Sequence, residues 1–358
     1  MFEIFKNKKV LVTGHTGFKG SWLSKWLLMM RAKVYGVSLS PNTTPNHFDV
    51  INLKNNMGSF FLDITNFEKL SKKIIEIKPD FLFHLAAQPI VGTSYEDPIL
   101  TYRTNVLGTL NVLESLKMLK NKCTAIIITS DKCYENKEWI WGYKETDQLG
   151  GIDPYSASKA SCEILIRSHT KSFFSEKSNI LIGVGRAGNV IGGGDWSKGR
   201  IVPDAILSWI DKKDLILRNP SSTRPWQHVL EPLSGYLQLA FKLSKNKKLH
   251  GEQFNFGPSS EQNHTVSKLI EEISTYWPNS NWRPSKNLPL KHESGLLKLN
   301  CDKSQAMINW GPTLSFNETV QMTAEWYKSF YIDKKNMEKF TEKQINFYHN
   351  LYKKRFNA

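Results

Sequence analysis

The chain has 358 residues, 40% of them hydrophobic and 23% charged, a composition typical of soluble proteins that can bury a full core. No apolar run approaches the roughly 18 residues of a membrane span, and the N-terminus lacks a signal-peptide layout, so no membrane association is predicted and a cytoplasmic location is expected. The net charge of +15 is spread along the chain, the four cysteines form no C-x-x-C pair and the nine histidines lack ligand spacing, which argues against a nucleic-acid partner, a disulfide framework and a metal site.

The first half of the chain alternates short apolar runs with helical patterns. Strands are predicted at residues 9–13, 34–37, 59–62, 81–85, 124–128 and 181–185, and helices at 22–27, 70–77, 105–119 and from Pro154 onward. Continuous apolar strands that alternate with helices form parallel sheets covered on both faces. The pattern therefore predicts an α/β fold with a Rossmann-type doubly wound parallel sheet.

Beyond residue 188 the pattern loosens, and loops rich in glycine, proline and arginine separate shorter elements. This part favours a smaller α/β region that covers a substrate. We therefore predict a dinucleotide-binding domain over 1–187 and a mainly substrate-binding region over 188–358, with segments of the two interleaved. Amphipathic helices are expected from Asp333 onward.

The segment from Thr13 to Gly20 has the spacing G-x-x-G-x-x-G between a predicted strand and a predicted helix, which is the context of a dinucleotide site. Glycines let the backbone approach a pyrophosphate, and the helix N-terminus supplies amide donors. The alternative is a glycine-rich turn without a ligand. His15 is bulky for such a loop, and we expect it to crowd the pyrophosphate and weaken dinucleotide binding.

The end of the second predicted strand bears on the choice of dinucleotide. Ser38 to Pro41 contain no carboxylate for the adenosine ribose and no arginine for a 2′-phosphate, so NAD is favoured while NADP stays open. Asp63, after the third strand, could accept a hydrogen bond from the adenine amine. It could equally be the N-cap of the helix that follows.

Two further groups of residues carry candidate chemistry. Tyr155 and Lys159 lie four residues apart on a predicted helix and so share one face. An ammonium about 4 Å from a phenol at an effective dielectric of about 20 contributes about 4 kcal/mol, or roughly three pK units, which would bring a phenolate within reach of neutral pH. Ser130, Asp131 and Lys132 place a hydroxyl, a carboxylate and an amine at the end of the fifth strand, where open parallel sheets have their active sites. The alternatives are an ordinary tyrosine–lysine pair and a turn that caps the strand.

These residues resemble the extended short-chain dehydrogenase/reductase family, and within it the nucleotide-sugar 4,6-dehydratases, most closely the branch that acts on CDP-glucose. The resemblance covers nearly the whole chain and rests on the segments 14–23, 84–89, 104–105, 129–136, 153–159, 186–196, 224–233 and 292–293. It implies an NAD-dependent reaction in which C4 of the sugar is oxidised, the 6-hydroxyl leaves as water and the hydride returns to C6. The product would be a CDP-linked 4-keto-6-deoxyglucose.

The resemblance also implies roles for single residues. Tyr155 would take the proton of the 4-hydroxyl, Ser130 would bind that oxygen, Lys159 would hold the nicotinamide ribose, and Asp131 would protonate the departing 6-hydroxyl. Together with Tyr155 and Lys159, the dinucleotide would contact Gly14, Thr16, Gly17, Phe18, Lys19, Gly20, Asp63, Ile64, Leu85, Ala86, Ala87 and Thr104. The sugar and its diphosphate would contact Gln88, Arg186, Asn189, Arg200, Arg224 and His228.

One position departs from the dehydratases that act on dTDP-glucose. They carry Asp-Glu where this chain has Asp131-Lys132, and the glutamate is taken as the C5 base, so the role of Lys132 as a base is open. Alternatives are a 4-epimerase or decarboxylase of a UDP-sugar, a dehydratase of a dTDP- or GDP-sugar, and a non-catalytic dinucleotide-binding protein. Relatives imply a homodimer or homotetramer.

Overall fold

The structure is a computed structural model, and it describes all residues except 1, 176–177, 260–261, 286–295 and 357–358. Within the described residues, seven parallel strands form one sheet in the order β11-β6-β5-β4-β1-β2-β3. Their bounds are β1 Lys9–Thr13, β2 Lys33–Ser38, β3 Gly58–Phe61, β4 Phe81–His84, β5 Cys123–Ile128, β6 Ile180–Ala187 and β11 Gln253–Phe256. This sheet confirms the predicted Rossmann-type α/β fold, and β11 is a strand that the sequence did not reveal.

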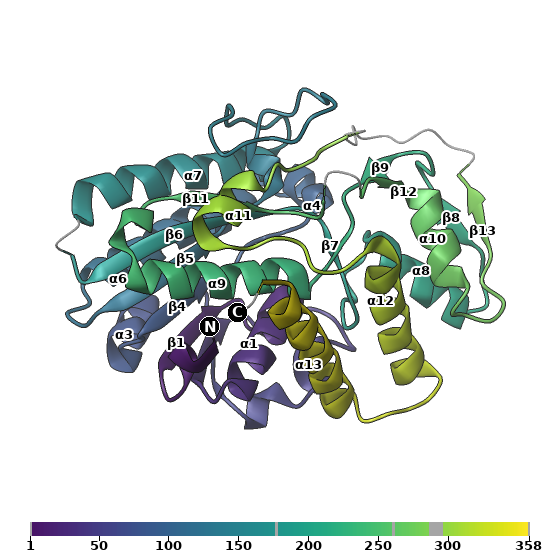
Figure 1. The fold of residues 1–358 in the computed structure, drawn as a ribbon, viewed down its shortest axis with the longest axis horizontal. Helices are drawn as coiled ribbons and strands as arrows, with labels where there is room; N and C mark the ends of the chain where they lie inside the picture. Colours follow the sequence, from purple (N-terminus) through teal and green to yellow (C-terminus); the bar gives the residue numbers. More distant parts are fainter. Residues whose placement is uncertain (1, 176–177, 260–261, 286–295, 357–358) are drawn as a thin grey trace.

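Helices cover both faces of the sheet, because successive residues of each buried strand point to opposite sides. Val10 and Val12 of β1 belong to one apolar core with α1 and α9, whereas Leu11 belongs to a second core with α3, α6 and α7. Figure 1 shows the sheet between these two layers. The helices that form them are α1 Phe18–Met29, α9 Leu230–Lys245, α3 Phe67–Ile77, α6 Gly108–Lys117 and α7 Pro154–Phe173.

Local sequence explains where the main helices begin. Asp153 caps α7 by accepting a hydrogen bond from the Ser156 backbone, and Pro154 takes the first helical position, where its missing N–H costs nothing. Asn66 caps α3 through the Lys69 backbone. Asp63 is therefore not the cap of α3, which corrects one of the two interpretations of that residue.

The predicted helix over 105–119 differs from the observed one. Residues Arg103–Leu107 form a π-helical turn, η3, and α6 follows and ends at Lys117. Asn105 lies inside that turn and is 1% exposed. Because π-turns inside helices occur frequently at functional sites, this distortion marks the segment as one to consider with the site.

Shorter elements connect the sheet to its surroundings. In chain order they are η1 Phe2–Phe5, α2 His47–Val50, η2 Leu53–Asn55, α4 Val91–Glu96, α5 Pro98–Tyr102, η4 Asp131–Cys133 and η5 Lys247–Leu249. A smaller region, at the right of Figure 1, contains α8 Ile201–Ile210, α10 Val266–Ser274 and the strand pairs β8 Leu215–Leu217 with β13 Trp282–Pro284 and β9 Thr223–Arg224 with β12 His264–Thr265. The remaining elements are β7 Val190–Ile191, which pairs with β10 Gln227–His228, and the helices α11 Asp302–Ile308, α12 Phe316–Tyr331 and α13 Met337–Phe356.

The last helix returns to the first one. Lys25 of α1 is buried, and its ammonium lies 2.7 Å from the Glu338 carboxylate and 2.6 Å from the Glu342 carboxylate of α13. The last helix, α13, therefore packs against α1, as Figure 1 shows. No described helix is long and apolar enough to cross a bilayer.

Candidate active site

The candidate site lies at the carboxyl ends of β1, β4, β5 and β6, which are neighbours or near neighbours in the sheet. Ligands of open parallel sheets bind in the crevice outside these ends. The loops that follow these four strands carry most of the residues predicted from the sequence. The sheet order therefore brings together segments that are more than a hundred residues apart.

The glycine turn after β1 is shaped by backbone contacts. Gly14 has a φ of +77°, and a Cβ there would lie 2.8 Å from the backbone nitrogen of Ala86, so only glycine fits. A Cβ on Gly20 would collide with the Gly14 carbonyl. Gly17, in contrast, is exposed and precedes α1, whose N-terminus receives no side-chain cap from the described residues. The turn thus presents open backbone and a helix N-terminus to an anionic group.

His15 does not point into this opening. Its ring packs over Gly36 of β2, lies edge-on to Phe48 at 5.3 Å, and shares a 2.6 Å hydrogen bond with Ser59. Burial lowers its pKa to about 4, so the imidazole is neutral at pH 7. The expectation that His15 crowds a pyrophosphate was wrong, because the missing side chain of Gly36 leaves the ring a place inside the protein.

The other residues predicted to contact a dinucleotide border the same crevice. Thr16 hydrogen-bonds Ser38 at 2.7 Å and donates to the Leu39 carbonyl at 2.9 Å, so the end of β2 carries neutral hydroxyls and no charge. Asp63 is exposed, with one carboxylate oxygen accepting from the Thr65 backbone. The other predicted dinucleotide contacts are buried or half-buried: Phe18, Lys19, Ile64, Leu85, Ala86, Ala87 and Thr104.

The three polar residues after β5 form a connected group. The Ser130 hydroxyl donates to Asp131 Oδ1 at 2.9 Å and accepts from the Lys132 backbone at 3.2 Å. The Lys132 ammonium lies 3.5 Å from Asp131 Oδ1 and donates to Asn189 Oδ1 at 3.2 Å. Asp131 is almost fully buried, whereas Lys132 reaches toward the solvent side of the crevice. A buried carboxyl with a hydroxyl and an amine beside it can give and take a proton.

Tyr155 and Lys159 lie on the first turns of α7, opposite this group, because η4 packs against α7. Burial raises the pKa of Tyr155 to about 12, while a side-chain hydrogen bond with Ser130 opposes the shift. The Lys159 ammonium donates to the Ile128 carbonyl at 3.5 Å, and burial lowers its pKa. The expected fall in the Tyr155 pKa is not present in the protein alone, because desolvation of the phenolate outweighs the nearby charges.

Three residues predicted to bind substrate are already engaged inside the protein. The Arg186 guanidinium makes a two-pronged pair with Glu163 at 2.9 and 2.8 Å, donates to the Tyr134 hydroxyl at 2.8 Å, and is 3% exposed. Gln88 donates to Thr101 and accepts from the Ile90 backbone. His228 is 0% exposed against Trp22. The placement of Arg186 contradicts the prediction, because protein acceptors take its guanidinium. Gln88 and His228 are buried, and among the described residues His228 Nε2 has no hydrogen-bond partner, so their contact with a substrate stays a prediction.

Two of the other predicted cations, Lys19 and Arg200, lie near the candidate catalytic groups. Arg200 pairs with Asp195 at 2.8 Å, and about a third of its side chain is exposed. Lys19 is half-buried near Arg200, and its pKa is lowered to about 7, first by burial and then by that arginine. Arg224 lies farther out on β9 and donates to the Thr223 carbonyl. Arginine and lysine side chains are the groups that bind a diphosphate, although Arg200 already has Asp195 as a partner.

Sequence reasoning missed the residues that hold this site in place. Glu163 accepts from Arg186 and from the Thr129 hydroxyl, and Asn105 links the Gln88 backbone to the Ser158 hydroxyl on α7. Asp195 orients Arg200 and receives the Tyr327 hydroxyl. Glu163 and Asn105 lie on different elements from their partners, so no local pattern indicates them, whereas Asp195 lies five residues before Arg200 in the same loop. His292 and Glu293 lie outside the described residues.

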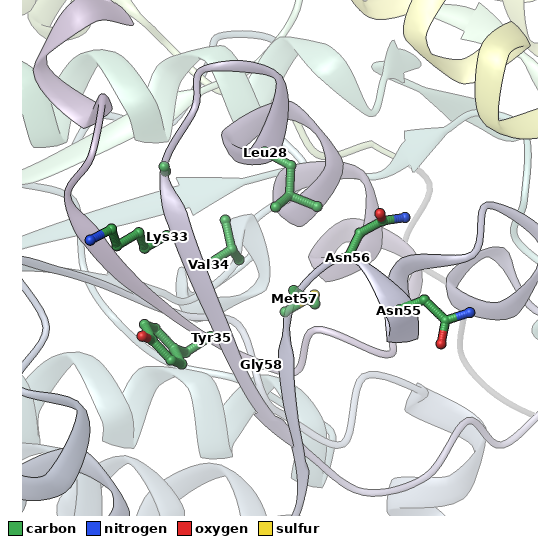
Figure 2. A pocket seen from close by; sticks show the side chains of 9 residues that line it. Leu28, Lys33, Val34, Tyr35, Asn55, Asn56, Met57 and Gly58 are labelled. Atoms are coloured by element: carbon green, nitrogen blue, oxygen red, sulfur yellow. The ribbon is translucent and has the colours of Figure 1, made fainter.

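Two cavities occur away from this crevice. One, of about 360 Å³, lies at the amino ends of β2 and β3, where Leu28, Lys33, Tyr35 and Met57 line it (Figure 2). Another, of about 350 Å³, is lined by Trp209, Trp277 and Tyr331 in the smaller region. Neither contains any of the predicted catalytic residues, and the first is at the end of the strands opposite to the one where α/β sheets bind ligands.

The chain is similar to known proteins over most of its length. Residues 11–323 match the sequence model of a family described as GDP-mannose 4,6 dehydratase. The chain is 46% identical to a CDP-glucose 4,6-dehydratase of Salmonella typhimurium over 92% of each chain, and 26% identical to a UDP-glucose 4-epimerase of Mycoplasma pneumoniae over 90% of this chain and 97% of that one.

Solved structures support the fold. The Bacillus thuringiensis protein Pal superposes with a TM-score of 0.77 at 24% identity, covering 90% of this chain and 99% of that one. A dTDP-glucose 4,6-dehydratase of Bacillus anthracis, solved in complex with NAD, has a TM-score of 0.72 at 22% identity, covering 90% and 97%. With the family match over most of its length, this chain belongs to the nucleotide-sugar 4,6-dehydratases of the extended short-chain dehydrogenase/reductase family.

Proposed function

We propose that the protein converts CDP-glucose to CDP-4-keto-6-deoxyglucose with NAD as a cofactor that is regenerated in each cycle. The observation that carries this proposal is the buried carboxyl of Asp131 beside the Ser130 hydroxyl and the Lys132 amine, opposite Tyr155. An oxidation at C4 needs a tyrosine-type base, but elimination of the 6-hydroxyl also needs an acid. The similarity to the Salmonella CDP-glucose enzyme supports the choice of sugar nucleotide.

The turn after β1 fits a dinucleotide. Gly17 leaves the backbone open at the α1 N-terminus, since a Cβ there would contact only the Gly14 carbonyl at 3.4 Å. Gly14, Phe18 and Lys19 would hold the diphosphate, and the uncharged end of β2 favours NAD over NADP. NAD bound there would supply the acceptor for a hydride from C4 of the sugar and the donor of a hydride to C6.

Side chains of the protein would carry out the proton transfers and hold the two ligands. Lys159 would hold the nicotinamide ribose and add a positive charge beside Tyr155, which receives the proton of the 4-hydroxyl. Asp131 would protonate the departing 6-hydroxyl. Lys132 is held by Asn189 and Asp131, so it would orient the acid or exchange the C5 proton. Arg200 and Arg224 would contact the substrate diphosphate.

We also propose that the protein forms a homo-oligomer through the neighbouring helices α5, η3 and α7. They carry large apolar side chains that are exposed in the single chain, including Ile99 at 78% and Ile164 at 62%. Apolar side chains gathered on adjacent surface helices support a contact with a second copy. Light scattering of the purified protein measures the oligomer directly.

The experiment that tests the function is incubation with CDP-glucose and a catalytic amount of NAD, followed by mass spectrometry. We expect the loss of one water per sugar with no net formation of NADH. Parallel reactions with dTDP-, UDP- and GDP-glucose test which nucleotide base the enzyme selects. An unchanged mass on all four sugars would refute elimination, and an unchanged mass with inversion at C4 would establish the epimerase instead.

A further inference from the structure

The loop between β7 and α8, residues 192–200, is held by two helices that are far apart in the sequence, and we call it the anchored loop. At its start, the Gly193 carbonyl accepts a hydrogen bond of 2.9 Å from the Trp22 indole of α1. A Cβ on Gly193 would collide with the Trp326 ring of α12. At its end, Arg200 is the residue that precedes α8. The loop therefore connects the helix of the glycine turn to the smaller region.

The Tyr327 side chain of α12 holds the middle of this loop. Its hydroxyl donates to the Asp195 carbonyl at 2.5 Å and accepts from the Asp195 backbone N–H at 3.2 Å. Tyr327 is 0% exposed and Asp195 is 4% exposed, so bulk water has little access to these bonds. Because one hydroxyl binds both backbone groups of Asp195, α12 fixes the place from which the Asp195 carboxylate extends.

The Asp195 carboxylate in turn sets the direction of the Arg200 side chain. Its Oδ1 accepts from the Ser197 backbone at 3.0 Å, and its Oδ2 accepts from Arg200 Nη1 at 2.8 Å. This is the one hydrogen bond that the guanidinium makes to the described part of the chain. A guanidinium has five N–H donors in a rigid fork, so most of the donors of Arg200 stay available to a ligand.

Arg200 lies close to the candidate catalytic groups. Its charge adds to burial in lowering the pKa of Lys19 to about 7, and it opposes the burial that raises the pKa of Tyr155 to about 12. The chain just before the anchored loop also borders the site, because Asn189 accepts a hydrogen bond of 3.2 Å from Lys132. A phosphate bound to Arg200 would therefore lie beside the groups that the sugar has to reach.

We propose that Asp195 and Tyr327 are positioning residues that hold the Arg200 guanidinium where it binds the diphosphate of the substrate. This inference rests on the proposed function. Tyr327 fixes the Asp195 backbone, the Asp195 carboxylate fixes the guanidinium, and the guanidinium presents its remaining donors to the phosphate oxygens. Asp195 and Tyr327 are both engaged inside the protein, so they act through Arg200 and do not touch the substrate themselves.

A carboxylate beside a phosphate-binding arginine has two opposite effects on the affinity for the substrate. It holds the guanidinium in place, which reduces the conformational entropy that is lost on binding. Its negative charge, however, repels the diphosphate. A purely electrostatic Asp195 would therefore weaken substrate binding, whereas a positioning Asp195 strengthens it. Removal of the charge distinguishes the two roles, because the affinity then changes in opposite directions.

Calorimetric titration with CDP-glucose measures this affinity. Asp195→Asn keeps the size of the side chain but offers one acceptor oxygen to two donors, and we expect it to weaken binding by about tenfold. Tyr327→Phe keeps the ring that packs edge-on against Trp196, leaves every charge in place, and should weaken binding by about fivefold. Tighter binding by Asp195→Asn would refute the positioning role.

Tyr331→Phe is the matched control for Tyr327→Phe. Tyr331 lies one turn farther along α12, and its hydroxyl accepts a hydrogen bond of 2.8 Å from the Trp196 indole of the same loop. It makes no hydrogen bond to Asp195, so we expect Tyr331→Phe to bind CDP-glucose as tightly as the wild type. An equal loss of affinity in the two variants would mean that any loosening of the anchored loop has this effect, and the specific role of Tyr327 would be wrong.

A double-mutant cycle tests whether Tyr327 acts through Arg200. Arg200→Met should weaken CDP-glucose binding by roughly 10- to 100-fold. In that background Tyr327→Phe should cause no further loss, because the guanidinium that it positions is gone. Full additivity of the two losses would contradict the proposal. In steady-state assays Tyr327→Phe should raise KM and leave kcat close to the wild-type value, since a diphosphate contact is made equally in the ground state and the transition state.

The outcomes for this inference and for the proposed function are distinct. Conversion of CDP-glucose by the wild type tests the function and requires none of the variants. If the wild type is active and both Asp195→Asn and Tyr327→Phe bind CDP-glucose with wild-type affinity, the positioning role is wrong and the function stands. If the wild type converts a different nucleotide-linked glucose, the same titrations with that sugar decide the inference, because each of these substrates carries the same diphosphate.

Discussion

The pair of Arg186 and Glu163 offers the sharpest test of how this site is built. Both side chains are 3% exposed, and two hydrogen bonds of 2.9 and 2.8 Å join the guanidinium to the carboxylate. Arg186→Met leaves the Glu163 carboxylate buried without its partner. Because breaking a buried pair on one side costs about 3–5 kcal/mol, we expect the free energy of unfolding to fall by that amount.

The double variant Arg186→Met/Glu163→Met is the control, because it removes both charges together. We expect it to recover much of the lost stability, since a buried pair replaced by apolar side chains of similar size is often neutral. Urea unfolding followed by circular dichroism measures all three proteins, and calorimetry measures CDP-glucose binding at a temperature where each is folded. An Arg186→Met protein with wild-type stability and greatly weakened binding would refute the structural role and restore Arg186 as a substrate contact.

Three further predictions concern the site, the pH dependence and the surface. A Cβ at Gly188 would lie 3.2 Å from Asp131 Oδ2, so Gly188→Ala should displace the acid and lower kcat by about tenfold, whereas Gly92→Ala, with open space around it, should not. Burial lowers the pKa of His47, His84 and His228 to about 3, so the unfolded chain binds protons first as the pH falls below 6.5. The contribution of these histidines to the free energy of unfolding is fully present above pH 6.5. It is lost between pH 6.5 and pH 3, by up to about 1.4 kcal/mol per pH unit for each histidine. Chemical denaturation at several pH values measures this slope, and an equal slope in His84→Gln would contradict the assignment for that residue. Ile164→Glu should reduce the mass measured by light scattering without lowering the melting temperature, and an unchanged mass would place the oligomer contact elsewhere.

Much of the fold follows from local patterns. The strands of the first half are apolar throughout, and the helices between them have capping residues such as Asp153 that fix their starts. β11 escaped detection because its four residues, Gln253–Phe256, are too few to give a clear pattern, and they gain their place by pairing with β6. The π-turn before α6 has no sequence signal of comparable strength.

The candidate site was only partly predictable for a related reason. Sequence identifies the chemical type of a side chain and the strand end on which it lies, which sufficed to bring Ser130, Asp131 and Tyr155 together. It does not identify the partner that a charged residue meets in the core. Arg186 resembles a phosphate ligand in the sequence, but in the structure it pairs with Glu163, which lies 23 residues earlier on α7. His15 was misjudged similarly, because the space above Gly36 depends on a neighbouring strand.

The origin of β11 has a consequence for how the chain folds during synthesis. β6 is buried along its whole length, and one of its edges is covered only when residues 253–256 arrive. A nascent chain that has emerged only as far as Ala187 therefore carries an unprotected sheet edge of the kind that pairs with other chains. We expect that the first half alone aggregates when expressed as a fragment, and that on the ribosome this edge is exposed to chaperones until the second half of the chain has been translated.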